Sequence, residues 1–224
     1  MIVLVVLIAG VAVLRLTNAG GASDVGGVAP STGPTAGAQS KVSVSPSAAE
    51  PLRLVAGAKA VDGVRVGYPR SPVGAVSAAI EYWVQLGSTL DSDRARRIGA
   101  RVAARSWKNA AADLAQGPVN SRRQLGLPPN GPVPPGASIN LGPVAYQVRD
   151  VKADSMTVLV LAYMVTTTPT TGTVSRLGVF PAPMRWDDGD WRIAVDERRT
   201  DYSSLQATPG TTQATAAGWL DFVR

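Results

Sequence analysis

Five basic residues between positions 94 and 108 form the array in this chain that could most directly bind a charged partner. Their spacings of three or four residues place side chains on one face of an α-helix, provided that the helical phase persists through the segment. Clustered arginine raises the local potential, so the stripe could contact a membrane surface, an acidic protein or DNA. The alternative is an ordinary solvated helix face. The candidate partner or membrane-surface contacts are Arg94, Arg97, Arg101, Arg105 and Lys108.

Direct nucleic-acid binding is disfavoured by what surrounds these arginines. The stripe lacks a series of interleaved aromatic side chains that could stack on bases, and no groove-reading motif accompanies it. Among the functional interpretations of the stripe, a membrane surface or a protein partner is therefore favoured over DNA.

Three aspartates near the C-terminus raise the question of a calcium site. Asp187, Asp188 and Asp190 lie close together, but the twelve-residue ladder of ligands with its terminal glutamate is missing. The Asp-Gly pair at 188 and 189 is instead a strong signal for a tight hairpin turn. We therefore predict a turn here and no metal site.

The chain has 0 His and 0 Cys, which excludes most catalytic chemistry at neutral pH. The commonest general base, the commonest metal ligand and thiolate nucleophiles are all absent. Catalysis by carboxylates alone would require two acids in one cavity. The candidates by elimination are Asp150, Asp154, Asp196 and Glu197. We predict no enzyme activity, no catalytic residue and no cofactor.

The tryptophans are interpreted as core residues rather than as a ligand cage. A small-molecule pocket lined by them remains the alternative. The residues concerned are Trp83, Trp107, Trp186 and Trp191.

An apolar run opens the chain, reading IVLVVLIAGVAVLRL from Ile2 to Leu16. A bilayer span needs about 20 apolar residues and a signal-peptide core about 7 to 15, so this run lies between the two. Thr17-Asn18-Ala19 would suit cleavage, whereas no basic residue precedes the run. Residues 1–19 are therefore predicted to be an uncleaved membrane anchor, with a cleaved signal segment or a cytoplasmic domain as alternatives.

Residues 20–52 are predicted to be a flexible linker, because this Pro/Gly/Ser/Ala tract has no helical or strand period and cannot bury enough apolar surface to fold. A tract of this length reaches on the order of 30 Å from a membrane. Residues 53–224 are predicted to be one domain, which carries the net charge of +6.

Three helices are expected at the start of that domain. Ser71 as N-cap and Pro72 at the first helical position open a mostly buried helix over residues 73–86. A second helix is expected from residue 91 or 92 to about 104. A third is expected over 106–115, stopped by Gly117-Pro118.

Strands are expected after a proline-rich loop. Val144, Tyr146 and Val148 alternate with polar residues in a half-exposed strand. Residues 156–166 are apolar on both faces and are predicted to be central in the sheet. Residues 174–186 form a further strand, in which two prolines suit an edge or a bulge. The turn at 187–190 leads into a last strand, and residues 212–224 either dock as a short helix or fray.

Helices followed by an antiparallel meander predict an α+β fold, with N-terminal helices packed on a curved four-stranded antiparallel sheet. Over about residues 60–200, this order and the Trp186–Trp191 hairpin resemble the nuclear transport factor 2-like cone. The segment Gly67–Ala75, GYPRSPVGA, is similar to one in membrane-anchored proteins of actinobacterial integrative and conjugative elements.

This resemblance implies a relative of the bitopic assembly factors of type IV secretion machines, which have a membrane helix, a linker and an extracytoplasmic cone. Such proteins are scaffolds that bind one another and neighbouring channel components. We therefore expect a single-pass cell-membrane protein that contacts other transfer proteins or further copies of itself. The alternative is a secreted or anchored ligand-binding or enzymatic domain with a cone-shaped pocket.

Overall fold

The computed structural model describes residues 50–224. The predicted membrane anchor at 1–19 and residues 20–49 of the predicted linker lie outside this part of the chain. Among the helices of residues 50–224, none has both the length and the apolar character that crossing a bilayer requires.

Helix α1 (Pro72–Gly87) begins and runs as the sequence predicts. The Ser71 hydroxyl accepts a hydrogen bond from the Gly74 amide at 3.1 Å, and Pro72 occupies the first turn. The proline lacks the N–H that would have no partner there, so it stabilises this helix end. Most of α1 is buried beneath the sheet, as the sequence predicts.

Helices α2 (Ser92–Val102) and α3 (Ala110–Gln124) pack closely together. A Cβ added at Gly99 of α2 would lie 3.0 Å from the Leu114 side chain of α3, so glycine permits this close approach.

The prediction that Gly117-Pro118 ends the third helix is wrong. Pro118 lies inside α3, where its burial with Val119 offsets the backbone hydrogen bond that proline cannot donate.

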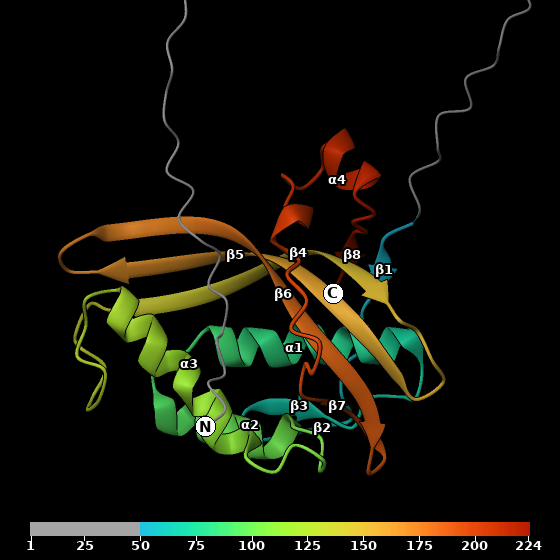
Figure 1. The fold of residues 1–224 in the computed structure, drawn as a ribbon, viewed down its shortest axis with the longest axis horizontal. Coiled ribbons are helices and arrows are strands. Elements are labelled where there is room, and N and C mark those ends of the chain that lie inside the picture. Colours follow the sequence, from blue (N-terminus) through green and yellow to red (C-terminus); the bar gives the residue numbers. More distant parts are fainter. Residues whose placement is uncertain (1–49) are drawn as a thin grey trace, which may run out of the picture. The chain divides into compact units, whose positions relative to one another are not determined.

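The sheet has the predicted four antiparallel strands, in the order β4 (Ser138–Arg149), β5 (Ser155–Thr168), β6 (Gly172–Asp187) and β7 (Asp190–Ile193). Strand β5 is central, as its apolar faces predict. Figure 1 shows the curved sheet above the three helices, so the chain has an α+β fold.

Strand β4 differs from its predicted pattern at one position. A bulge between Pro143 and Ala145 leaves Val144 without a partner on β5. Val144 therefore packs on the opposite side of the sheet from Tyr146 and Val148, with which simple alternation had grouped it.

The hairpin between β6 and β7 is the predicted tight turn. Asp188 and Gly189 have φ of 54° and 74°, and positive φ at both central residues matches the right-handed twist of the two strands. Pro181 and Pro183 lie on β6 without a bulge in its pairing to β5. Strand β7 pairs only with Met184–Asp187, so on the other side of β6 both prolines lie beyond the paired strand, at an edge of the sheet.

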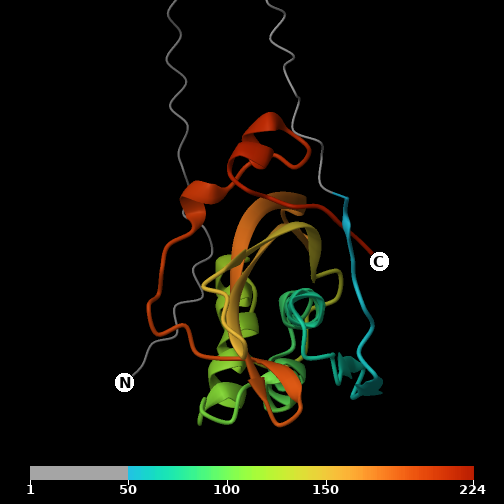
Figure 2. The same cartoon turned by 90° about the vertical axis from the view of Figure 1, so that its right-hand side faces the viewer.

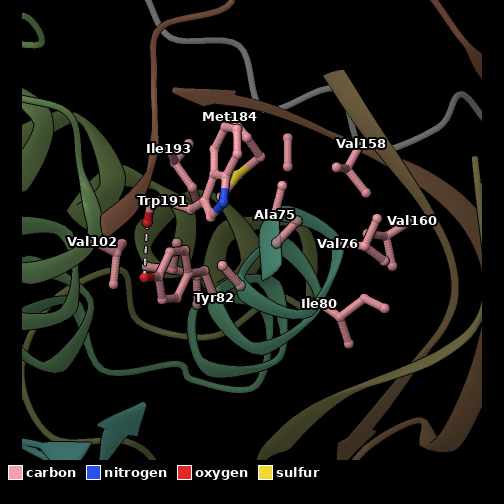
Figure 3. Packing of buried hydrophobic residues seen from close by; sticks show 14 of the residues in the cluster. Ala75, Val76, Ile80, Tyr82, Val102, Val158, Val160, Met184, Trp191 and Ile193 are labelled. Atoms are coloured by element: carbon pink, nitrogen blue, oxygen red, sulfur yellow. Dashed lines mark hydrogen bonds between the residues drawn. The ribbon is translucent and has the colours of Figure 1, made fainter. Parts of the chain in front are cut away.

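The larger core lies between the sheet and the helices. It includes Val158 and Val160 from β5, Met184 from β6, and Trp191 from β7. Figure 3 shows these side chains around α1, with the Tyr82 hydroxyl donating a hydrogen bond to the Trp191 carbonyl oxygen at 3.0 Å.

The C-terminal segment docks on the other face of the sheet, which decides between the two alternatives for residues 212–224. Helical turn η1 (Ser203–Leu205) and helix α4 (Thr212–Ala216) cover Leu159 and Leu161 together with Trp219 (Figure 2).

Two short strand pairs were not predicted. Strand β1 (Leu52–Arg53) pairs in parallel with β8 (Phe222–Val223), which brings the two ends of the described chain together. Strands β2 (Lys59–Val61) and β3 (Val64–Val66) form an antiparallel hairpin beside α1.

Candidate partner-binding surface

Helix α2 separates its apolar and basic residues cleanly. Ala95, Ile98 and Val102 are buried against the rest of the fold, whereas the arginines of the helix are exposed. The Asp91 carboxylate caps the helix by accepting hydrogen bonds from the amides of Asp93 and Arg94 at 2.8 and 3.2 Å. The fold thus holds α2 with its arginines toward solvent.

The helical phase on which the continuous stripe depended does not persist to Lys108. Helix α2 ends at Val102, because Ala103 takes an extended conformation and forms a bridge to Ile193 of β7. The next amide, that of Ala104, donates to the Ile193 carbonyl at 2.8 Å. Arg105 and Lys108 consequently lie on the loop between α2 and α3.

All five candidate side chains are nevertheless exposed, on α2 and on the loop that follows it. We call them the basic surface. Its members are Arg94, Arg97, Arg101, Arg105 and Lys108.

Three members of the basic surface have partners within the fold. Arg94 donates to the Gln85 side chain at 2.7 Å, and the Arg101 guanidinium lies 3.1 Å from the Asp62 carboxylate. Arg105 forms an ion pair with Asp188. These groups are solvent-exposed, and such pairs contribute only about 0–1 kcal/mol each, so a partner could replace them at low cost.

The other two members, Arg97 and Lys108, have neither an ion pair nor a side-chain hydrogen bond within residues 50–224. Their charges are therefore fully available to an acidic partner. Substitutions at these two positions can therefore test partner binding by the basic surface without breaking an ion pair of the fold.

Asp190 holds the loop before α1 against the sheet. Its carboxylate, 5% exposed, accepts hydrogen bonds from the amides of Gly67 at 2.7 Å, Tyr68 at 2.8 Å and Trp191 at 2.9 Å. The Trp191 indole also donates to the Pro69 carbonyl at 3.0 Å. The segment Gly67–Ala75, singled out in the sequence, is thus anchored to the β6–β7 hairpin.

The aspartates of the hairpin are occupied by the fold. Asp187 accepts a hydrogen bond from the Arg105 amide at 2.7 Å, Asp188 pairs with the Arg105 side chain, and Asp190 binds three amides. In residues 50–224 no group of three or more potential ligands is arranged to hold a metal ion.

Two buried tyrosines lie beside Asp190. Burial raises the pKa of Tyr82 far above its usual value, and the Asp190 carboxylate adds to the shift. Burial, with a contribution from Glu81 and then Asp190, raises the pKa of Tyr68 in the same way. The two rings meet edge to face, with centroids 6.0 Å apart. Because burial disfavours the charged phenolate, both hydroxyls stay protonated as parts of the core.

Of the four acids considered for carboxylate catalysis, Asp150 and Asp196 have partners of their own in the fold, and both contact Arg198. Asp150 pairs with Arg198, and Asp196 accepts from the amides of Arg198 and Arg199 at 3.2 and 3.1 Å. The Asp154 carbonyl, rather than its carboxylate, accepts from the Trp186 amide, and Glu197 is exposed.

The tryptophans pack as core residues. Trp191 is buried, and Trp83, Trp107 and Trp186 lie partly buried against the same cluster. The indole of Trp83 donates to the Pro181 carbonyl at 3.2 Å, and that of Trp107 to the Asp113 carboxylate at 2.7 Å. These bonds fix the rings as parts of the wall between helices and sheet.

These features define an α+β domain with three helices on one face of a four-stranded antiparallel sheet and a C-terminal segment on the other. Residues 19–220 match the family described as Domain of unknown function (DUF8175), and the chain belongs to that family. No curated protein and no solved structure matches it.

Proposed function

We propose that this protein is a non-catalytic, membrane-tethered scaffold component of a conjugative DNA-transfer apparatus of the type IV secretion kind. In this proposal residues 1–19 anchor it in the cell membrane, and the nuclear transport factor 2-like domain is extracytoplasmic. Its partners are other transfer proteins, with self-association as a further mode. Support comes from the order of apolar run, linker and domain, and from the resemblance of Gly67–Ala75 to proteins of conjugative elements.

The observation that carries the proposal is the basic surface. A scaffold needs an exposed patch that a partner can bind without unfolding the domain. Arg97 and Lys108 are free of ion pairs within residues 50–224, and the neighbouring arginines are held only by exposed pairs. Charge of this kind accelerates association with an acidic protein and selects it over basic ones.

The basic surface and the first strand of the described domain lie apart from each other. The chain enters the described domain at Glu50 and continues into β1, at the upper right of Figure 1, whereas α2 lies at the bottom of the same view. Figure 2 agrees, with β1 above and the helical layer below. A partner bound at the basic surface therefore stays clear of β1, the strand at which the chain enters the described domain.

Charge reversal at the two free positions tests this proposal. The double variant Arg97→Glu, Lys108→Glu breaks none of the ion pairs described above, so the fold should be retained. The variant should lose about 1.4 kcal/mol of binding free energy, which corresponds to a tenfold weaker complex with the partner. In donor cells whose DNA transfer depends on the full chain, we therefore expect the transfer frequency to fall about tenfold.

The matched control reverses two charges elsewhere. Lys152 and Arg199 are exposed and lie outside the basic surface, so Lys152→Glu, Arg199→Glu changes the net charge equally. This control should transfer DNA at the wild-type frequency. At equal protein levels by immunoblot, wild-type transfer by the Arg97, Lys108 variant, or an equal loss in the control, contradicts the proposal.

A further inference from the structure

Arg122 is a buried cation without a carboxylate partner. It lies in the last turn of α3 and is 3% exposed. Its Nη1 donates to the carbonyl oxygens of Pro128 at 3.3 Å and Gly131 at 2.8 Å. Its Nε is buried and has no hydrogen-bond acceptor, and no ion pair within residues 50–224 includes it.

The elements that pack around Arg122 carry few acids. Helix α2, which packs against α3, has Asp91 and Asp93 at its N-terminal end, but Asp91 caps its own helix and Asp93 pairs with Arg96. Residues 114–149 include no Asp or Glu, and neither do residues 155–186. These two stretches supply most of α3, the loop over residues 125–137, and strands β4, β5 and β6. A Cβ at Gly136 of that loop would lie 3.4 Å from Pro169, so the loop rests against the turn between β5 and β6 at the left of Figure 1.

Burial of an arginine in this way is costly. A buried charge normally has an opposite charge or a full set of hydrogen bonds, and an enclosed donor without an acceptor costs about 1–3 kcal/mol. The negative end of the α3 dipole supplies only about half a charge. Two neutral carbonyls therefore satisfy the guanidinium incompletely.

The loop depends on the same two hydrogen bonds. Within residues 128–136 the side-chain hydrogen bonds to the rest of the described chain are those from Arg122 to Pro128 and Gly131, and after them the Ala137 amide donates to the Pro134 carbonyl at 3.1 Å. Before this stretch, the Leu127 amide donates to the Arg122 carbonyl at 2.8 Å. Any group that takes over the Arg122 guanidinium thus releases the middle of the loop.

We propose that Arg122 is a receptor for an oxyanion, a carboxylate or phosphate group, that replaces the carbonyls of Pro128 and Gly131. Two anionic oxygens match the planar fork of a guanidinium and bind it more strongly than neutral carbonyls do. The anion neutralises the buried charge, gives Nε an acceptor, and frees residues 128–136. This site is separate from the basic surface and does not depend on the scaffold function.

The test follows the arginine side-chain Nε–H resonances of the ¹⁵N-labelled full chain by NMR. Inorganic phosphate or acetate is titrated against sodium chloride of equal ionic strength. The resonance that is missing from the Arg122→Gln variant is expected to shift and saturate in oxyanion but not in chloride. A response to phosphate alone assigns a phosphate ligand, and a response to both includes carboxylates.

Loop release gives a second measurement. The chain has 0 Cys, so a spin label on Asn130→Cys reports this loop alone. Its spectrum should narrow when the oxyanion binds. Arg123→Gln, a change at the exposed neighbouring arginine, is the matched control and should keep both responses.

Two results would overturn the proposal: no saturable shift beyond that in chloride, or the same label response in the Arg122→Gln chain. If that variant fails to fold, Arg122→Lys decides. Lysine keeps the charge but loses the fork, so oxyanion binding should weaken about 10-fold, and unchanged binding rejects the site.

Discussion

Asp190 joins two parts of the fold that are far apart in the sequence. Its carboxylate accepts three amide hydrogen bonds, two of them from Gly67 and Tyr68 in the loop before α1. One carboxylate oxygen accepts from Gly67 and the other accepts from Tyr68 and Trp191, so both oxygens of the side chain are needed. The residue types alone placed Asp190 in a turn, and only the three-dimensional structure reveals which amides it binds.

Replacing Asp190 by asparagine tests this arrangement. An asparagine amide would point N–H groups at one of the amides that now donate, so Asp190→Asn should lower the free energy of unfolding by about 2 kcal/mol. Urea denaturation measures the change. The matched control Asp188→Asn alters an exposed pair in the same turn and should cost less than about 1 kcal/mol. An equal loss of stability in the two variants would contradict a structural role for the three amide hydrogen bonds to Asp190.

The buried tyrosines make stability depend on alkaline pH. Burial raises the pKa of Tyr82 in the folded chain, whereas in the unfolded chain this tyrosine ionises near its usual pKa of 10.0. The folded state therefore holds more protons above pH 10, and its stability is complete below that pH and falls as pH rises.

The variant Tyr82→Phe should change this dependence in two ways. It loses the hydrogen bond to the Trp191 carbonyl, at a cost of about 1 kcal/mol near pH 8. It also removes one ionising group, so the fall above pH 10 should be shallower by up to about 1.4 kcal/mol per pH unit. Denaturation at pH 8, 10 and 11 gives the slope, and a slope equal to that of the wild type contradicts the argument.

Among the elements, those with strong local signals were predictable. The Ser71-Pro72 cap, the apolar central strand β5 and the Asp-Gly turn at 188 and 189 all agree with the structure. In each case the physical cause lies within a few residues. A second Asp-Gly pair, Asp62-Gly63, makes the β2–β3 turn with φ of 54° and 80°, and this equally local signal is sufficient to predict that hairpin.

The features that could not be predicted depend on distant contacts. Pro118 remains helical because its burial in the tertiary fold outweighs a local helix stop. Val144 changes sides because of a bulge against β5. At the basic surface, the acids Asp62 and Asp188 approach from other elements, so the sequence identified the arginines but not which of them are paired.

Glycines in helices α1 and α3 give a matched test of the close packing between α1 and the loop that precedes it. A Cβ at Gly74 in the first turn of α1 would lie 2.0 Å from the Pro69 carbonyl oxygen, so Gly74→Ala must displace the loop that Asp190 holds. We expect a loss of about 3 kcal/mol of stability. Gly117 in α3 has open space around it apart from the ring of Pro118, the next residue, which disfavours a preceding Cβ in helical conformation, so Gly117→Ala should cost less, about 1 kcal/mol. Thermal denaturation compares the two, and similar values would contradict the close approach.

For the described domain as a whole, the pairing of β1 with β8 sets the geometry of any tether. The amides of Leu52 and Leu54 donate to the carbonyls of Asp221 and Val223 at 3.0 and 2.8 Å, so the two ends of residues 50–224 lie together. Tyr146 and Leu220 exchange two further backbone hydrogen bonds of 2.9 Å. The C-terminal segment thereby holds β1, the first strand of the described chain, against the sheet.

The side of the membrane on which this domain lies is the test of the whole proposal. Because the chain has 0 Cys, Ser203→Cys creates a single thiol on exposed η1. In intact cells a membrane-impermeant maleimide should label this variant, since an anchored extracytoplasmic domain presents η1 to the medium or the wall. Ala79→Cys, buried in α1, should stay unlabelled until the chain is unfolded, which shows that labelling requires exposure. Labelling of Ser203→Cys only after lysis would place the domain in the cytoplasm and remove the basis for a scaffold on the outer side.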